Sequence, residues 1–186
     1  LDVISAPLDF YGLNYYMPTR VAAGSGSGSS PDGEAQEMAD LPFRLEPFPE
    51  YPTTGFGWPI APEYFAVALK EVHERYGYRL PPVYITENGA SFEDEVGEDG
   101  RVHDAARTAY LADHLGAALA AVAPGGSAEG LDLRGYFAWS LLDNWEWAAG
   151  FTQRFGIIHV DFETGQRTPK ASYDWLAQVS RLRPRA

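Results

Sequence analysis

The sequence predicts an α/β fold in which parallel strands alternate with covering helices. Patterns typical of strands and helices follow one another as strand, helix, strand, helix, strand, helix. Tyr16, Glu87 and Glu146 fall at or just after the ends of the three predicted strands. The sequence therefore predicts about three βα units of a (β/α)8 TIM barrel, whose active site lies on the loops after its strands. A doubly wound open sheet is the alternative, but no Gly-rich phosphate loop joins a strand to a helix here.

The first predicted unit begins with a strand over residues 8–16, which ends in polar and aromatic side chains. Residues 24–40 are rich in Gly, Ser, Asp and Glu, so they bury little apolar surface and are expected to form a mobile loop. Residues 42–59 combine prolines with aromatic residues and are expected to form an irregular loop that carries Trp58.

The second unit contains the most informative strand of the chain. A helix is expected to begin near Pro62, with a buried stripe of Phe65, Leu69, Val72 and Tyr76, and to end at Gly77. Residues 83–86 then read as a short buried strand that ends at Glu87, and a turn follows. A carboxylate at this place could act in chemistry, or it could cap the turn or pair with an arginine.

The third unit follows an acidic loop over residues 91–101, which reads as a solvated loop or, less well by its spacing, as a calcium site. Asp104 is expected to cap a helix that ends before Pro124. Its predicted buried stripe consists of Leu111, Leu115, Ala118, Leu119 and Val122. A strand over residues 133–141, a hairpin near residues 156–166 and a helix over residues 172–182, with Leu176 and Val179 inward, complete the chain.

Composition limits the possible partners and compartments. The 186 residues are 45% apolar, enough for one domain with a core, and carry a formal charge of -12. Such a charge disfavours nucleic acid and anionic membrane as partners. Without cysteine there is no disulfide or thiolate metal site, so a cytoplasmic location is the default. The four histidines show no zinc spacing, His73 and His114 are expected at a surface or boundary, and neither metal nor cofactor is expected.

Several motifs occur in the order and spacing of one enzyme family. They are Asp9-Phe10-Tyr11-Gly12-Leu13-Asn14-Tyr15-Tyr16, Ile85-Thr86-Glu87-Asn88-Gly89, Trp139-Ser140-Leu141-Leu142-Asp143-Asn144-Trp145-Glu146-Trp147, Arg154-Phe155-Gly156, Val160-Asp161 and Arg167-Thr168-Pro169-Lys170. Through these motifs the chain resembles the family 1 glycoside hydrolases, the β-glucosidase family. The resemblance covers nearly the whole chain and implies a retaining β-glycosidase that acts on neutral β-D-glucosides or galactosides through a covalent intermediate.

The resemblance also implies roles for single residues. Glu87 matches the nucleophile, Tyr16 the tyrosine that orients it, and Asn14 a residue near both. Glu146 matches the acid that accepts hydrogen bonds from the 4- and 6-hydroxyls of the sugar. The remaining expected substrate-binding residues are Trp58 at the entrance, Trp139 under the sugar face, Trp147 at a ring hydroxyl and Phe155 near C6. Core packing is the alternative for Trp139 and Trp145, and a plain surface carboxylate is the alternative for Glu146.

Part of the family's active site has no match in the sequence. No Asn-Glu-Pro motif, which carries the acid/base glutamate, occurs here. We therefore expect residues 1–186 to form the C-terminal part of a single catalytic barrel domain, covering strands 6 to 8, with an N-terminal portion as partner. Three strands alone should leave open sheet edges and an exposed apolar face. The alternative is a non-catalytic carbohydrate-binding or inactive piece of such a barrel.

Overall fold

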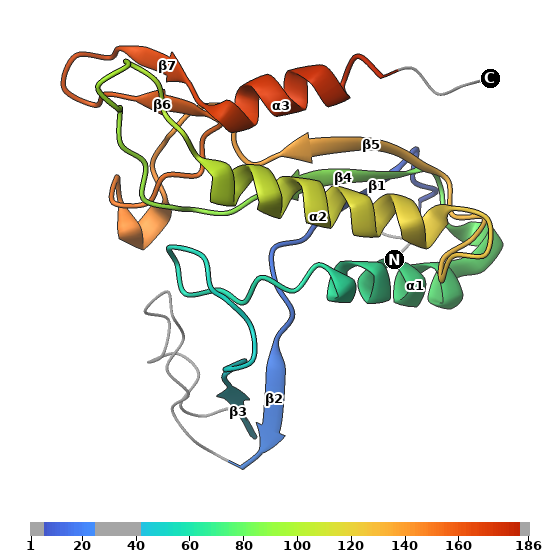
Figure 1. Cartoon of the computed structure of the whole chain (residues 1–186). Coiled ribbons are helices and arrows are strands. Elements are labelled where there is room, and N and C mark those ends of the chain that lie inside the picture. The colour runs from blue at the N-terminus through green and yellow to red at the C-terminus, as the bar shows by residue number, and fades with distance from the viewer. Residues whose placement is uncertain (1–5, 25–41, 183–186) are drawn as a thin grey trace.

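A three-stranded parallel sheet forms the centre of the protein. The structure is a computed structural model that describes residues 6–24 and 42–182. The sheet has the order β1 (Tyr11–Asn14), β4 (Val83–Asn88), β5 (Leu133–Ala138), and both strand pairs are parallel (Figure 1). The three predicted strands and their parallel arrangement are confirmed.

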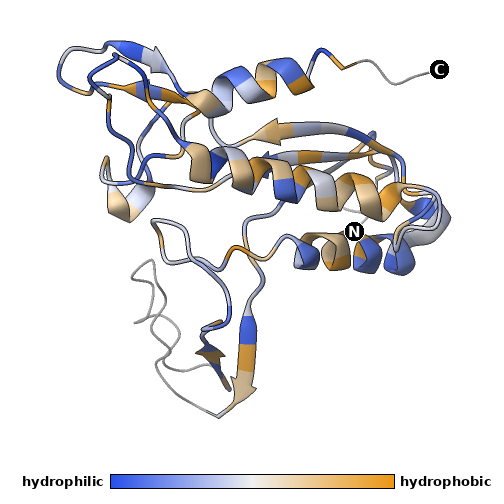
Figure 2. Cartoon of the chain, in the orientation of Figure 1, coloured by the Kyte–Doolittle hydropathy of each residue, from blue (hydrophilic) through white to orange (hydrophobic). Residues whose placement is uncertain are grey.

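Helices cover one face of this sheet. α1 (Glu63–Tyr76) and α2 (Ala105–Val122) lie next to each other, and α3 (Ala171–Val179) lies beside α2 (Figure 1). The turns of α1 and α2 alternate between hydrophobic and hydrophilic residues, as expected for helices with one buried side (Figure 2). The core between helices and sheet includes Phe65, Leu69, Val83, Ile85, Ala118 and Ala121.

The opposite face of the sheet has no helix over it in the described part of the chain. Because side chains alternate along a strand, Tyr84 and Thr86 point away from the core that Val83 and Ile85 enter. Phe10 and Phe137 lie beside Tyr84 and are 53% and 57% exposed. Together with Pro82, Thr86 and Arg134 they line a shallow pocket of about 440 Å³. The expected exposed apolar face is present.

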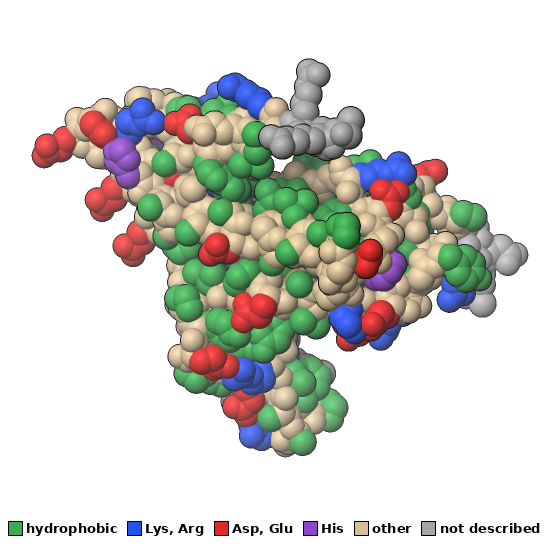
Figure 3. Space-filling model, turned by 45° about the vertical axis from the view of Figure 1, so that its right-hand side comes forward, with side chains coloured by type: hydrophobic (Ala, Val, Ile, Leu, Met, Phe, Trp, Pro, Cys, Tyr) green, Lys and Arg blue, Asp and Glu red, His purple; other side chains and the backbone are tan. Residues whose placement is uncertain are grey.

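Two hairpins accompany the sheet. β6 (Ile158–Val160) pairs with β7 (Arg167–Pro169), as predicted. β2 (Arg20–Ala23) pairs with β3 (Phe43–Glu46) and projects from the body of the protein, where Figure 3 shows hydrophobic side chains beside basic and acidic ones. The irregular loop expected over residues 42–59 is therefore wrong at its start. The predicted mobile loop lies outside the described residues except for Gly24.

Some predicted helix faces are wrong. Leu119 is 54% exposed and Tyr76 is 41% exposed, whereas His114, expected near the surface, is completely buried. The His114 ring stacks on Tyr110 with centroids 3.9 Å apart, because α2 turns this side toward both α1 and the sheet. Asp104 stands at the N-cap of α2, but its carboxylate makes no capping hydrogen bond.

Neither a membrane span nor a metal cluster occurs among the described residues. None of the helices in these residues combines the length and the apolar composition that a bilayer crossing needs. No group of three His, Asp or Glu side chains is placed to hold a metal ion within residues 6–24 and 42–182. In the acidic loop considered for calcium, Asp94 pairs with Arg107 and Lys170, and Asp99 pairs with His103.

Candidate active site

Glu87 and Tyr16 form the centre of the candidate site. Glu87 lies in the last part of β4, in register with Asn14 of the neighbouring strand β1. The Tyr16 hydroxyl donates a hydrogen bond of 2.6 Å to Glu87 Oε2. A hydrogen bond of this length fixes the direction of the carboxylate. Among the described residues Glu87 has Tyr16 as its hydrogen-bond partner, and it neither pairs with an arginine nor caps the turn, as the alternative expected.

Tyr16 is itself held from several sides. Its carbonyl oxygen accepts a hydrogen bond of 2.9 Å from the Tyr110 hydroxyl. Its ring meets Trp58 and Phe155 edge-on, with centroids 5.4 and 6.3 Å apart. Burial, followed by the hydrogen bond to Glu87, raises the pKa of Tyr16 far above its usual value, so the hydroxyl keeps its proton as a donor.

Hydrogen bonds of the Asn88 side chain hold the end of β4 in place. It is fully buried, and its amide nitrogen donates to the Tyr15 carbonyl at 2.8 Å and to the Tyr110 hydroxyl at 3.3 Å. Its amide oxygen accepts 2.6 Å from the Tyr136 hydroxyl. Sequence reasoning gave Asn88 only a turn and missed both tyrosines, because their contacts join β4 to residues 22 and 48 positions away.

Trp139 and Glu146 lie on the loop after β5. Trp139, joined to Ser140 by a cis peptide bond, is half-buried, and its indole N–H donates to Glu146 Oε1 at 3.2 Å. Glu146 is only 9% exposed. Burial raises the pKa of Glu146, the bond from Trp139 opposes this rise, and the charge of Glu87 adds to it. Because β4 and β5 are parallel, Glu87 near the end of β4 and Glu146 after β5 lie at the same end of the sheet. The charges of both carboxylates raise the pKa of Tyr16 as well.

Trp147 stands at the outer rim of this loop. It begins the short 3-10 helix η3 (Trp147–Ala149) with a positive φ of 43°, an uncommon conformation for a bulky residue. The Glu146 N–H donates to the Gly150 carbonyl at 2.7 Å and closes the turn. Trp147 is 85% exposed, so its indole is free to meet a ligand. Trp145 is 60% exposed, and the alternative of core packing for it is wrong.

The other predicted binding residues surround Tyr16. Trp58 stacks on Phe56 with ring centroids 4.9 Å apart. Phe155 is 2% exposed, and its ring packs against those of Tyr16 and Trp58. Its contact with a sugar stays a prediction. The Asn14 side chain accepts a hydrogen bond of 2.7 Å from the Thr86 hydroxyl, while its strand position places it beside Glu87.

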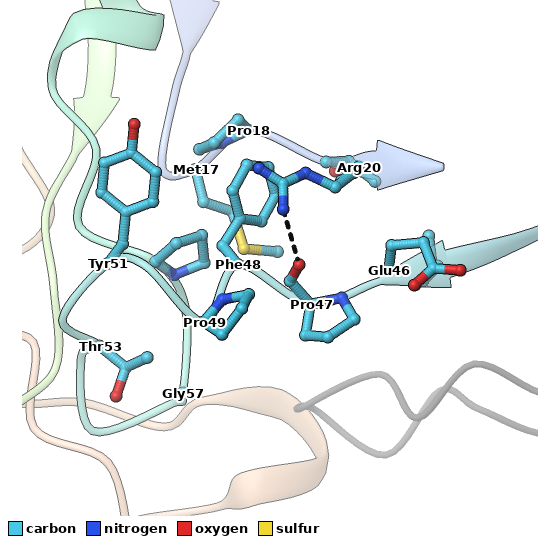
Figure 4. A pocket seen from close by; sticks show the side chains of 13 residues that line it. Met17, Pro18, Arg20, Glu46, Pro47, Phe48, Pro49, Tyr51, Thr53 and Gly57 are labelled. Atoms are coloured by element: carbon cyan, nitrogen blue, oxygen red, sulfur yellow. Dashed lines mark hydrogen bonds between the residues drawn. The ribbon is translucent and has the colours of Figure 1, made fainter. Parts of the chain in front are cut away.

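A pocket of about 500 Å³ adjoins the Trp58 loop (Figure 4). Prolines and aromatic side chains line it between the β2–β3 hairpin and residues 47–59. The Arg20 guanidinium lies 4.0 Å from the centre of the Phe48 ring and donates to the Pro47 carbonyl at 3.1 Å (Figure 4). This pocket flanks the site but includes neither Glu87 nor Glu146.

Comparison with known proteins gives a consistent result. The profile of glycosyl hydrolase family 1 matches residues 1–183. β-Glucosidase A of Thermotoga maritima is 45% identical over 179 residues, which cover 96% of this chain. A bifunctional β-D-glucosidase/β-D-fucosidase of Bifidobacterium breve is 40% identical and matches 94% of this chain. The structure of the Thermotoga maritima β-glucosidase in complex with noeuromycin superimposes with a TM-score of 0.79 at 43% identity, covering 94% of this chain.

The matches cover only part of each relative. They extend over 36% of the Thermotoga maritima enzyme, 37% of the Bifidobacterium breve enzyme and 35% of the chain solved with noeuromycin. The chain thus spans about a third of the length of these relatives.

Proposed function

Because the chain belongs to glycosyl hydrolase family 1, we propose that it supplies the nucleophile and the sugar-binding half of a retaining β-glycosidase active site. The observation that carries this proposal is the 2.6 Å bond from Tyr16 to Glu87, with Glu146 at the same end of the sheet. Residues 1–186 would form the C-terminal part of one (β/α)8 barrel domain, strands 6 to 8. The N-terminal portion of that barrel would supply the acid/base glutamate.

The proposed reaction runs in two displacements. The Glu87 carboxylate attacks the anomeric carbon while the glycosidic C–O bond breaks and the leaving oxygen takes a proton from the acid/base glutamate. Water then attacks the same carbon, gives its proton to that glutamate, and releases Glu87 with retained configuration. The role of Tyr16 is to hold Glu87 in line with the anomeric carbon, which lowers the entropic cost of reaching the transition state.

The sugar would be held by the loop after β5. Glu146 offers carboxylate oxygens to the 4- and 6-hydroxyls, and the bond from Trp139 fixes one of those oxygens in place. The ring of Trp139 provides an apolar face for the C–H side of the sugar. A negative charge at Glu146 would repel a 6-phosphate, so the proposed substrates are neutral β-D-glucosides and galactosides.

The bare face of the sheet supports the proposed N-terminal partner. Phe10, Tyr84 and Phe137 present aromatic surface with no helix of the described chain against it. Both β1 and β5 are edge strands of the three-stranded sheet. In a closed barrel the remaining strands would pair with these edges and fill the interior against this face.

A chimera tests the proposal. The 179 residues of this chain that match Thermotoga maritima β-glucosidase A would replace the segment they match there, which gives a complete chain called the chimera below. We expect it to hydrolyse 4-nitrophenyl β-glucoside and to release the β-anomer first, as followed by proton NMR. Glu87→Ala should abolish this turnover, whereas Glu98→Ala in the exposed acidic loop should leave it unchanged. An inactive chimera, or release of the α-anomer first, would contradict the proposal.

A further inference from the structure

Six charged side chains form a largely buried cluster between the loops that follow β4 and β5, the start of α2 and the start of α3. It consists of Asp94, Asp104, Arg107, Asp143, Arg154 and Lys170, and we call it the ion cluster. Five of the six side chains are at most 1% exposed, and Arg154 is 24% exposed. Three carboxylates face three cations, so the cluster is electrically balanced.

A cluster of this kind calls for a reason other than stability. Removing charges from water is costly, and well-packed apolar residues often stabilise a fold as well as a buried ion pair does. What ion pairs add is direction, because a carboxylate and a cation meet only in a few geometries. The elements that the ion cluster joins therefore indicate what it does.

Lys170 connects the two halves of the candidate site. Its ammonium donates to Asp94 at 2.6 Å and to Asp143 at 2.9 Å. Asp94 lies on the loop that follows β4 and Glu87. Asp143 lies three positions before Glu146 on the loop after β5.

The other members brace the same two loops. Arg107 makes two bonds to Asp94, of 2.9 and 2.7 Å, and donates to the Ala90 carbonyl at 3.3 Å and to the Arg154 carbonyl at 2.6 Å. Asp143 accepts further bonds from Arg154 at 2.7 Å and from the Gly156 N–H at 3.0 Å. The ion cluster thus makes hydrogen bonds to the backbone after β4, at Ala90, and to the backbone after β5, at Arg154 and Gly156.

We propose that Lys170 is a positioning residue that fixes the Glu146 loop relative to Glu87 and so sets recognition of the sugar's 6-hydroxyl. The proposal rests on the proposed function, because it assigns Glu146 to sugar binding. Lys170 touches neither carboxylate of the site; it acts through Asp143 and Asp94.

Removal of the ammonium leaves one buried negative charge without its counterpart, so Lys170→Met should lower stability. In Lys170→Met the side chain keeps nearly the same length, Asp94 keeps its two bonds from Arg107, and Asp143 keeps Arg154 and the Gly156 N–H. The link between the two loops is lost, while each carboxylate retains a partner. Lys170→Gln replaces the ammonium with an amide that can still donate to both carboxylates.

The test compares two substrates in the chimera. The kcat/KM for 4-nitrophenyl β-glucoside is divided by that for its 6-deoxy analogue, which lacks only the 6-hydroxyl. This ratio does not depend on the fraction of folded enzyme. We expect Lys170→Met to lower the ratio at least tenfold and Lys170→Gln to restore part of it. Lys70→Met, which removes a surface lysine paired with Glu74 on α1, should leave the ratio unchanged.

The outcomes distinguish a positioning role of Lys170 from a role in stability alone. Equal losses on both substrates, with an unchanged ratio, overturn the proposal, and so does the absence of activity on both substrates in both Lys170 variants. An inactive parent chimera instead contradicts the proposed function, so the two failures are distinguishable.

Discussion

One hydrogen bond gives Glu87 its direction. The Tyr16 hydroxyl lies 2.6 Å from Glu87 Oε2, and Trp58, Phe155 and Tyr110 hold Tyr16 in place. The packed rings thus fix the Tyr16 hydroxyl in its donating position before a ligand binds, so the Glu87 carboxylate does not need to reorganise during a reaction.

Replacing Tyr16 with Phe should therefore lower activity without unfolding the protein. We expect kcat/KM of the chimera to fall by a factor that corresponds to a loss of about 1.5–3 kcal/mol of transition-state stabilisation, the contribution of a hydrogen bond to a charged group. Steady-state kinetics on 4-nitrophenyl β-glucoside measures this loss. Tyr78→Phe, at a residue 98% exposed, is the matched control. Equal kcat/KM in both variants would rule out an orienting role for Tyr16.

The bond from Trp139 to Glu146 predicts a pH effect. This bond lowers the pKa of Glu146 against the rise that burial causes. In Trp139→Phe the donor is lost and an aromatic face remains, so the pKa of Glu146 rises further and the carboxylate becomes protonated at higher pH. We expect the acidic limb of the pH profile of kcat/KM to move to higher pH.

Trp145→Phe serves as the control for this pH effect, because Trp145 is exposed and makes its aromatic contact with Phe151. The acidic limb of this variant should stay with that of the parent chimera. A limb that stays in place for Trp139→Phe, or moves to lower pH, would show that Glu146 does not limit activity in acid.

At the scale of elements, the ends of β4 and β5 approach each other closely where the site begins. The Trp139 N–H donates to the Asn88 carbonyl at 2.9 Å. A Cβ added to Gly89 would lie 1.8 Å from the Trp139 carbonyl oxygen, and backbone atoms cannot yield at this distance. The glycine after Asn88 is thus required by packing between the two strand ends.

Gly89→Ala should consequently destabilise the folded chimera by about 3 kcal/mol or more, in the range of overpacked cores and strained backbones. Gly116→Ala in α2 is the control, because nothing lies within 4 Å of its added Cβ. That control should stabilise the protein by about 0.5–1 kcal/mol. Urea unfolding measures both changes. A Gly89→Ala variant as stable as the parent would contradict the observed approach of the strands.

Local patterns predicted most elements and the parallel arrangement of the three sheet strands, whereas one hairpin and several side-chain contacts between distant segments were missed. The helix from Pro62 and the strand ending near Glu87 follow from local spacing, and both are present. The β2–β3 hairpin was not predicted, because its two four-residue strands are far apart in the sequence and no local turn signal joins them. The burial of His114 was not predicted, because the sequence around a polar helix residue does not show which distant residues will cover it.

The same limit applies to the site. Tyr16, Glu87, Trp139 and Glu146 were named through family motifs, and the structure brings them together at one end of the sheet. Tyr110, which binds Tyr16 across 94 positions, belongs to no such motif and could not be found in this way. The ion cluster is equally long-range, because Lys170 reaches Asp94 over 76 positions.

At the scale of the whole molecule, the site occupies one end of a sheet that the helices of the described residues cover on one face only. The helices bury Val83 and Ile85, whereas Phe10 and Phe137 remain exposed on the other face. The chain also spans about a third of the length of its relatives. Both observations agree with the proposal that the N-terminal portion of a barrel completes the site.

Covalent labelling tests the central claim most directly. A 2-fluoro β-glucoside with an activated leaving group should trap the chimera as a stable glycosyl-enzyme, because the second displacement becomes slow. Mass spectrometry of the digested protein would then locate the sugar. The account predicts a single label on Glu87. A label on another residue, or an active chimera that acquires no label, would contradict it.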